Sequence, residues 1–264
     1  MRATVNGVAL NYRVDGPADA PWMVFSNSLA TDLSMWDAEA AHYAKRFRVL
    51  RYDTRGHGES GATASPYNLD MLVADAAALM DQVGVAKPIF VGLSLGGMTA
   101  MGLALSRPDK LKAIVVCAAR ADVPEGFQKM WDERIATARQ KGMAALLDAT
   151  VQRWFTAELL VTKPGFLGNV ERMIKATAVE GYAGCANALL GLDYFRQLGR
   201  INLPALFVAG ANDVAAPSAH MKNMAEQVKG ARFVELSPSG HIINMQQPAK
   251  FRETLDGFIA GLPA

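Results

Sequence analysis

Cysteine and histidine are both scarce in this chain. Of its 264 residues, only Cys117 and Cys185 are cysteines, and four are histidines. Two thiols cannot form the disulfide framework that stabilises small secreted proteins, so the fold must depend on a buried apolar core. The histidines are dispersed without the spacing of metal ligands, and we therefore expect no metal site.

An excess of charge of either sign is also absent. The 27 Lys and Arg residues nearly balance the 25 Asp and Glu residues, which leaves a formal net charge of +2. This balance disfavours nucleic acid and membrane surfaces as partners. Polar residues, among them Arg13 and Asp15, interrupt the N-terminal segment. No secretory signal is therefore predicted, and we expect a cytoplasmic protein.

Long hydrophobic runs are limited to one stretch. Residues 88–106 contain no charged side chain, and they are numerous enough to cross a bilayer. The stretch also contains four glycines. We interpret it as a strand followed by a helix, both buried on all sides, rather than as a membrane span.

Short apolar runs alternate with helical segments along most of the chain. An apolar fraction of 51% over this length is enough for one domain with a full core. Strands are expected at 22–26, 49–52, 88–91, 113–117, 205–209 and 232–236, and helices at 36–44, 69–83, 95–106, 218–228 and 248–259. Residues 2–14 alternate around Asn6-Gly7, which indicates a hairpin. The pattern predicts an α/β fold with a mostly parallel sheet flanked by helices.

One interval breaks this alternation. Residues 122–200 contain no convincing strand, only amphipathic helical pattern with Trp131, Trp154 and Phe155. We expect a core made of residues 1–121 and 201–264, and a helical lid formed by residues 122–200 inserted between two core strands. Ligands of open α/β sheets bind at the carboxyl edge of the strands, so the lid is expected to decide which substrate enters.

A candidate nucleophile lies in the sequence G-L-S-L-G at residues 92–96. Ser94 stands at the centre of G-x-S-x-G, with a predicted strand before it and a predicted helix after it, which is the context of a nucleophile elbow. The turn must be sharp, so the positions two before and two after the serine cannot carry bulky side chains. The backbone N–H of Leu95 is expected to face the same space, at the start of the helix.

The candidate base and acid follow from chain order. A serine hydroxyl needs a base, and the base needs an orienting acid, in the order Ser, acid, His. His241 lies in a loop just after the last predicted strand and is the best placed of the four histidines. Asp213 follows the strand at 205–209 and is our candidate acid, with Asp122 as the alternative.

An oxyanion hole requires two donors that converge on the developing negative charge. Leu95 would supply one backbone N–H. The other is expected from the loop at residues 27–31, and we assign it to the N–H of Leu29. Asn27-Ser28 stands here in place of the His-Gly pair that is common in loops that supply this second donor. A main-chain donor tolerates that change in side chain.

Over its whole length, the chain resembles the α/β-hydrolase superfamily. The motifs are G-L-S-L-G at 92–96, D-T-R-G-H-G-E-S at 53–60, G-A-N-D at 210–213 and G-H at 240–241. More narrowly, the chain resembles 3-oxoadipate enol-lactonases. That resemblance depends on S-N-S-L-A-T-D-L-S-M-W at 26–36, R-V-L-R-Y-D-T-R-G-H-G at 48–58, C-A-A-R at 117–120, R-W-F-T at 153–156 and E-G-Y-A-G-C at 180–185.

The resemblance implies hydrolysis of 3-oxoadipate enol-lactone to 3-oxoadipate in the β-ketoadipate route of aromatic catabolism, without a cofactor. The substrate would be a small molecule with a free carboxylate, which a dry pocket must pair with a cation or strong donors. Arg120 and Arg134 are the candidates for that contact, and Trp131 and Trp154 are candidates for the pocket wall. We expect Arg55 and His57 only to stabilise their own loop.

Other functions share this machinery. A carboxylesterase or a C–C bond hydrolase would use the same serine, acid and histidine, and His241 could also activate water directly. A ligand-binding receptor on this fold is the non-enzymatic alternative. An intact set of three residues argues against a receptor, because a binding pocket does not need them. The sequence leaves the oligomeric state open.

Overall fold

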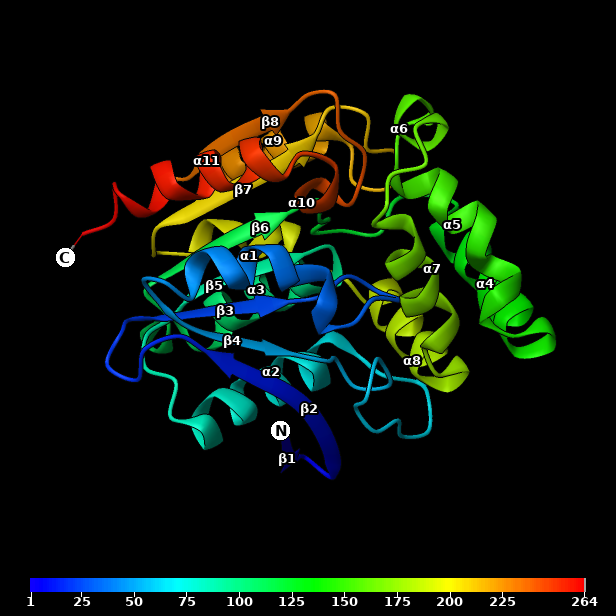
Figure 1. The fold of residues 1–264 in the computed structure, drawn as a ribbon, viewed down its shortest axis with the longest axis horizontal. Coiled ribbons are helices and arrows are strands. Elements are labelled where there is room, and N and C mark those ends of the chain that lie inside the picture. The colour runs from blue at the N-terminus through cyan, green and yellow to red at the C-terminus, as the bar shows by residue number, and fades with distance from the viewer. Residues whose placement is uncertain (264) are drawn as a thin grey trace.

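An eight-stranded sheet forms the centre of the molecule, in the spatial order β1-β2-β4-β3-β5-β6-β7-β8 (Figure 1). The computed structural model describes residues 1–263. Strand β2 is antiparallel to β1 and to β4, and every other neighbouring pair is parallel. The strands are β1 Arg2–Val5, β2 Val8–Asp15, β3 Trp22–Ser26, β4 Arg48–Tyr52, β5 Ile89–Leu93, β6 Ala113–Cys117, β7 Ala205–Gly210 and β8 Arg232–Leu236.

The central strands are apolar along their whole length because they are covered on both faces. Every residue of β3, β5, β6 and β7 is buried. Parallel strands enclosed in this way read as continuous hydrophobic runs rather than alternating ones. The predicted hairpin is also confirmed: Asn6 and Gly7 join β1 to β2 with φ of 47° and 76°. Positive φ at both central residues suits a tight antiparallel turn.

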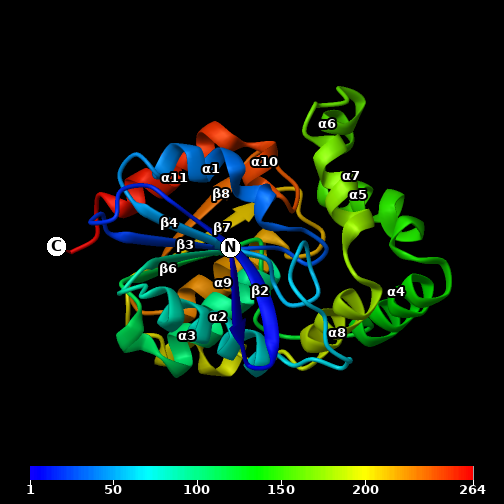
Figure 2. The ribbon, with the colours of Figure 1, turned by 60° about the horizontal axis from the view of Figure 1, so that its bottom comes forward.

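Helices cover both faces of the sheet. Figure 2 shows α1 and α11 on one face, with α2, α3 and α9 on the other. Their bounds are α1 Asp37–Tyr43, α2 Leu69–Val83, α3 Leu95–Ser106, α9 Ser218–Gln227, α10 Ile243–Gln246 and α11 Pro248–Ile259. Short 3-10 turns lie at Leu33–Trp36, Pro108–Lys110, Met143–Leu146 and Phe195–Arg200. The predicted mostly parallel α/β arrangement is confirmed, with element ends within one or two residues of expectation.

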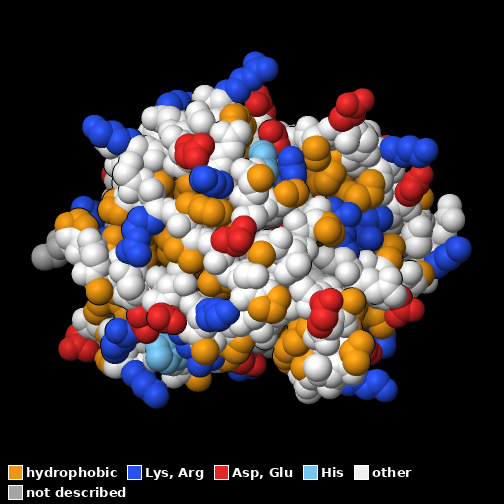
Figure 3. Space-filling view, turned by 90° about the horizontal axis from the view of Figure 1, so that it is seen from above, with side chains coloured by type: hydrophobic (Ala, Val, Ile, Leu, Met, Phe, Trp, Pro, Cys, Tyr) orange, Lys and Arg blue, Asp and Glu red, His pale blue; other side chains and the backbone are white. Residues whose placement is uncertain are grey.

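The apolar stretch at residues 88–106 divides into β5 and α3. Ten of the twelve residues of α3 are buried, because the helix packs between the sheet and α2. None of the helices in residues 1–263 has the length and apolarity needed to cross a membrane. On the face shown in Figure 3, basic and acidic side chains are interleaved, in line with the small net charge.

Five helices lie between β6 and β7, beside the carboxyl ends of the parallel strands (Figures 1 and 2). They are α4 Phe127–Lys141, α5 Leu147–Trp154, α6 Ala157–Val161, α7 Leu167–Ala176 and α8 Val179–Leu190. We call residues 122–200 the helical insertion. An isolated bridge joins its first residue, Asp122, to Asp193, which precedes the last 3-10 turn of the insertion. Arg172 on α7 forms an ion pair of 2.8 Å with Asp32, which links the insertion to the loop after β3.

Candidate active site

Ser94 occupies a strained turn between β5 and α3. Its backbone has φ 56° and ψ −112°, on the left-handed side that residues with a Cβ rarely adopt. Two backbone hydrogen bonds hold it there: the Ser94 N–H donates to the carbonyl of Cys117 at 2.8 Å, and the Ser94 carbonyl accepts from the N–H of Met98 at 3.0 Å. Such strain persists only where the surroundings impose it, and it is concentrated at functional sites.

The glycines on either side of Ser94 are required by backbone contacts. A Cβ on Gly92 would collide with the carbonyl of Gly96, and a Cβ on Gly96 would collide with the carbonyl of Ser26. The turn can therefore form only if both positions lack side chains. This explains the G-x-S-x-G spacing in steric terms.

Asp213 and His241 meet although 28 residues separate them in the sequence. Asp213 follows β7 and His241 follows β8, so neighbouring strand ends bring them to the same edge of the sheet. His241 Nδ1 lies 2.8 Å from Asp213 Oδ2, and the two side chains are 5% and 0% exposed. A carboxylate can only accept, so Nδ1 carries the proton and Nε2 is left as an acceptor.

The alternative acid, Asp122, lies in a different set of contacts. Its carboxylate accepts from Arg120 Nη2 at 3.1 Å and lies 3.4 Å from Nε2 of His220. Of the two carboxylates considered from the sequence, the structure places Asp213 on the candidate base.

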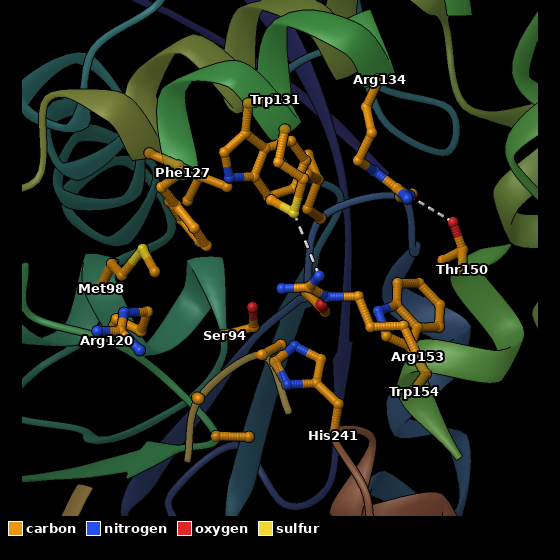
Figure 4. A pocket seen from close by; sticks show the side chains of 18 of the residues that line it. Ser94, Met98, Arg120, Phe127, Trp131, Arg134, Thr150, Arg153, Trp154 and His241 are labelled. Carbon is orange, nitrogen blue, oxygen red and sulfur yellow. Dashed lines mark hydrogen bonds between the residues drawn. The ribbon is translucent and has the colours of Figure 1, made fainter. Parts of the chain in front are cut away.

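Ser94 and His241 line the same cavity (Figure 4). Within residues 1–263, no hydrogen bond joins the Ser94 hydroxyl to the imidazole. Catalytic hydrogen bonds are often long until substrate is in place, so the lack of this bond is compatible with proton transfer from Ser94 to Nε2.

The two proposed oxyanion donors are both free of internal acceptors. Leu95 is the first residue of α3, where a helix leaves its N–H groups unpaired. In the described part of the chain, neither the N–H of Leu95 nor that of Leu29 donates to a protein acceptor. A hydrogen bond of 3.0 Å from Gly96 N–H to the carbonyl of Asn27 ties the two loops together. The pair is thus available to an oxyanion beside Ser94.

A cavity of about 610 Å³, with the solvent space at its open mouth included, lies over these residues. The core provides its base, which includes Ser94, Leu29 and His241, while the helical insertion provides most of the walls. All four residues predicted for substrate contact line it: Arg120, Trp131, Arg134 and Trp154. Six other residues of the insertion line it and were not predicted from the sequence, namely Phe127, Met130, Thr150, Arg153, Tyr182 and Leu189.

Trp154 connects the insertion to the candidate base. Its indole stacks on the imidazole of His241, with ring centroids 6.5 Å apart at 28°. Its carbonyl accepts from the backbone N–H of His241 at 2.7 Å. A Cβ on Gly240 would meet that carbonyl, which explains the glycine of the G-H motif.

The three arginines of the cavity have different partners. Arg120 is paired with the carboxylate of Asp122 at 3.1 Å. Arg134 donates to the hydroxyls of Tyr182 and Thr150, at 3.0 Å and 2.6 Å. Among residues 1–263, the one hydrogen-bond acceptor of the Arg153 side chain is the sulfur of Met130, at 3.2 Å. The one signal for Arg153 in the sequence was its place beside Trp154 in the R-W-F-T motif.

Arg55 and His57 lie outside the cavity. Arg55 forms a buried ion pair of 2.7 Å with Asp75. His57 is fully buried, and its Nδ1 lies 3.1 Å from the carbonyl of Arg55. Burial lowers the pKa of His57 from 6.5 to about 4. Within residues 1–263 there is no group of three or more His, Cys, Asp or Glu side chains that could hold a metal ion.

Comparisons with known proteins agree with the fold described above. The family model described as "alpha/beta hydrolase fold" matches residues 21–248. The chain is 34% identical to 3-oxoadipate enol-lactonase 2 of Acinetobacter baylyi, over 96% of this chain and 94% of that one. It is 28% identical to a putative carbamate hydrolase, RutD, of Pseudomonas savastanoi, over 92% of this chain and 95% of that one. Among solved structures, the enol-lactonase of Burkholderia xenovorans LB400 has a TM-score of 0.94 and 40% identity, and the match covers 98% of this chain and 100% of that one.

Proposed function

Because this chain belongs to the α/β-hydrolase fold family, we propose that it is a serine hydrolase that opens 3-oxoadipate enol-lactone to 3-oxoadipate. The observation that carries the proposal is the Asp213–His241 pair, whose imidazole lines the same arginine-lined cavity as Ser94. The 3-oxoadipate enol-lactonase of Acinetobacter baylyi and the enol-lactonase of Burkholderia xenovorans LB400 support the choice of substrate.

The first step is acylation of the serine. Ser94 Oγ attacks the lactone carbonyl carbon while His241 Nε2 takes the hydroxyl proton. Asp213 stabilises the imidazolium that results. The carbonyl oxygen becomes an oxyanion between the N–H groups of Leu29 and Leu95. Collapse of the tetrahedral intermediate breaks the ring C–O bond and expels an enolate, which takes the proton from His241 to give an enol, and the enol tautomerises to a ketone.

The second step releases the acid. His241 removes a proton from water, and the hydroxide attacks the acyl carbon through a second tetrahedral intermediate. The proton then returns to Ser94 Oγ as the ester bond breaks. In the alternative route, His241 activates water for direct attack on the lactone, and no covalent intermediate forms.

The helical insertion, residues 122–200, would act as the lid over the core formed by residues 1–121 and 201–264. It supplies Trp131, Arg134 and Trp154 to the cavity walls, while the core supplies the reacting groups. Substrate choice would accordingly depend on the insertion, and the chemistry on the core.

A substrate panel tests the proposal. We expect kcat/KM for the enol-lactone to exceed that for neutral p-nitrophenyl esters. Preference for the neutral esters would indicate a general carboxylesterase, and preference for a ring-fission product would indicate a C–C bond hydrolase. A carbamate substrate belongs in the same panel, because the putative carbamate hydrolase RutD of Pseudomonas savastanoi is also similar.

A fluorophosphonate probe separates the enzyme from a ligand-binding receptor. We expect the folded protein to be labelled at Ser94 and the Ser94→Ala variant to remain unlabelled. Failure of the parent to react would favour the receptor.

A further inference from the structure

Arg153 brings a positive charge into the cavity without an acidic partner. Its side chain extends from α5, and Figure 4 shows the guanidinium reaching into the middle of the cavity, between Trp131 and His241 in this view. Its one polar contact is the thioether of Met130 at 3.2 Å, and a thioether is a weak acceptor. The remaining donors of the guanidinium have no acceptor among residues 1–263. A half-buried cation in this state is poorly solvated by its surroundings.

The surroundings add further positive charge. Burial lowers the pKa of Arg153, and the charges of Arg134 and Arg120 act in the same direction, whereas the carboxylate of Asp213 acts in the opposite one. Arg134 is held by two neutral hydroxyls and lies over the ring of Trp131 at 5.7 Å, and it has no carboxylate partner in the described part of the chain. Arg120 differs, because Asp122 already neutralises it.

The cavity wall provides nothing to balance these charges. No Asp or Glu of the described residues lines the cavity. The nearest functional carboxylate, Asp213, has a fully buried side chain and is engaged by His241. An anionic ligand that enters the cavity would therefore replace its hydrogen bonds to water with hydrogen bonds to two guanidinium groups, neither of which is paired with a carboxylate. Such charge-assisted hydrogen bonds are among the strongest that a protein forms.

We propose that Arg153, together with Arg134, forms a subsite for the carboxylate at the far end of the acyl chain, and that Arg153 determines preference for acidic over neutral esters. This inference depends on the proposed function in one respect, namely that the acyl group is transferred to Ser94. On binding, the carboxylate would replace the Met130 sulfur as the partner of Arg153. The planar guanidinium can bind both carboxylate oxygens at once, whereas a lysine at this position could not.

The test uses two esters that differ only at the far end of the chain. Mono-p-nitrophenyl adipate carries a terminal carboxylate, and p-nitrophenyl hexanoate carries a methyl group. The measured quantity is the ratio of their kcat/KM values, acidic over neutral. In Arg153→Met we expect this ratio to fall about 10- to 100-fold, mainly through KM for the adipate ester, as expected for loss of a charged hydrogen-bonded contact. The ratio for Arg153→Lys should lie between the ratio for Arg153→Met and that for the parent.

Two further variants sharpen the test. Arg120→Met removes a cavity arginine that is already paired, so its ratio should fall much less than that of Arg153→Met. Arg196 is exposed and has no hydrogen-bonded partner among the described residues, so Arg196→Met serves as the matched control for loss of one positive charge. An unchanged ratio in Arg153→Met would overturn the proposal. An equal fall for both esters would also overturn it, because Arg153 would then act on the reacting carbonyl or on folding.

A binding measurement keeps this inference separate from the proposed function. If the parent hydrolyses neither ester and does not open the enol-lactone, the proposed function fails, but adipate binding can still be measured as a rise in melting temperature. We expect adipate to stabilise the parent and Arg196→Met but not Arg153→Met. Equal stabilisation of all three proteins would overturn the subsite.

Discussion

Asp213→Asn should abolish most of the activity by reversing the proton arrangement on His241. Asp213 Oδ1 accepts from the backbone N–H groups of Ala215 and Ala216 at 2.7 Å and 3.1 Å. In the variant these two donors would hold the carboxamide oxygen, because an NH2 group there would face two N–H groups. The NH2 must then point at His241 and donate to Nδ1. The ring proton moves to Nε2, which can no longer accept from Ser94.

The expected loss is about 10⁴-fold in kcat, the size known for the same change in serine proteases, and it corresponds to about 5 kcal/mol of transition-state stabilisation. The assay is hydrolysis of the enol-lactone, or of a neutral p-nitrophenyl ester, with the melting temperature measured in parallel. Asp122→Asn is the matched control, because that carboxylate does not contact His241. If Asp213→Asn keeps kcat within about tenfold of the parent, the assignment of the acid is wrong.

Three further predictions concern stability. Gly96→Ala should lower the free energy of unfolding by about 3 kcal/mol, because the new methyl group meets a backbone carbonyl, whereas Gly257→Ala, in open space on α11, should be neutral or stabilising in the same urea titration. The folded pKa of His57 is about 4, against an ordinary value of 6.5, so the unfolded chain binds the extra proton between these pH values and stability falls as pH drops. Between pH 7 and pH 5, the free energy of unfolding of His57→Gln should therefore fall by about 2 kcal/mol less than that of the parent. Identical dependence of this free energy on pH would contradict the prediction. Arg172→Met should speed amide hydrogen exchange in α7 more than in α8, because only α7 loses the ion pair with Asp32; equal rates would show that this pair does not hold the insertion.

The core was predictable because its signals are local. Runs such as 113–117 are apolar throughout since both faces of their strands are covered, and Asn6-Gly7 can form only a narrow range of turns. The placement of Asp213 and His241 followed from the topology, because residues that come just after neighbouring parallel strands meet at one edge.

The cavity wall was less predictable because it depends on how short helices pack. Arg134 and Arg153 lie on different helices of the insertion, and no period within either helix shows that both side chains meet in one cavity. The pairing of Arg120 with Asp122 could not be distinguished from a substrate contact, since both options place the arginine at the same strand end. Arg153 was missed because its neighbour Trp154 carried the more conspicuous side chain.

The double contact of Trp154 with His241 limits how the cavity can open. A rigid outward swing of the whole insertion would pull the carbonyl of Trp154 off the backbone of His241 and separate the two stacked rings. Substrate entry and product exit must then use a local displacement elsewhere in the insertion, with the C-terminal end of α5 as the fixed point. If the insertion acts as the proposed lid, Trp154 ties its movement to the proposed base, and the imidazole should keep its position while substrate enters and product leaves.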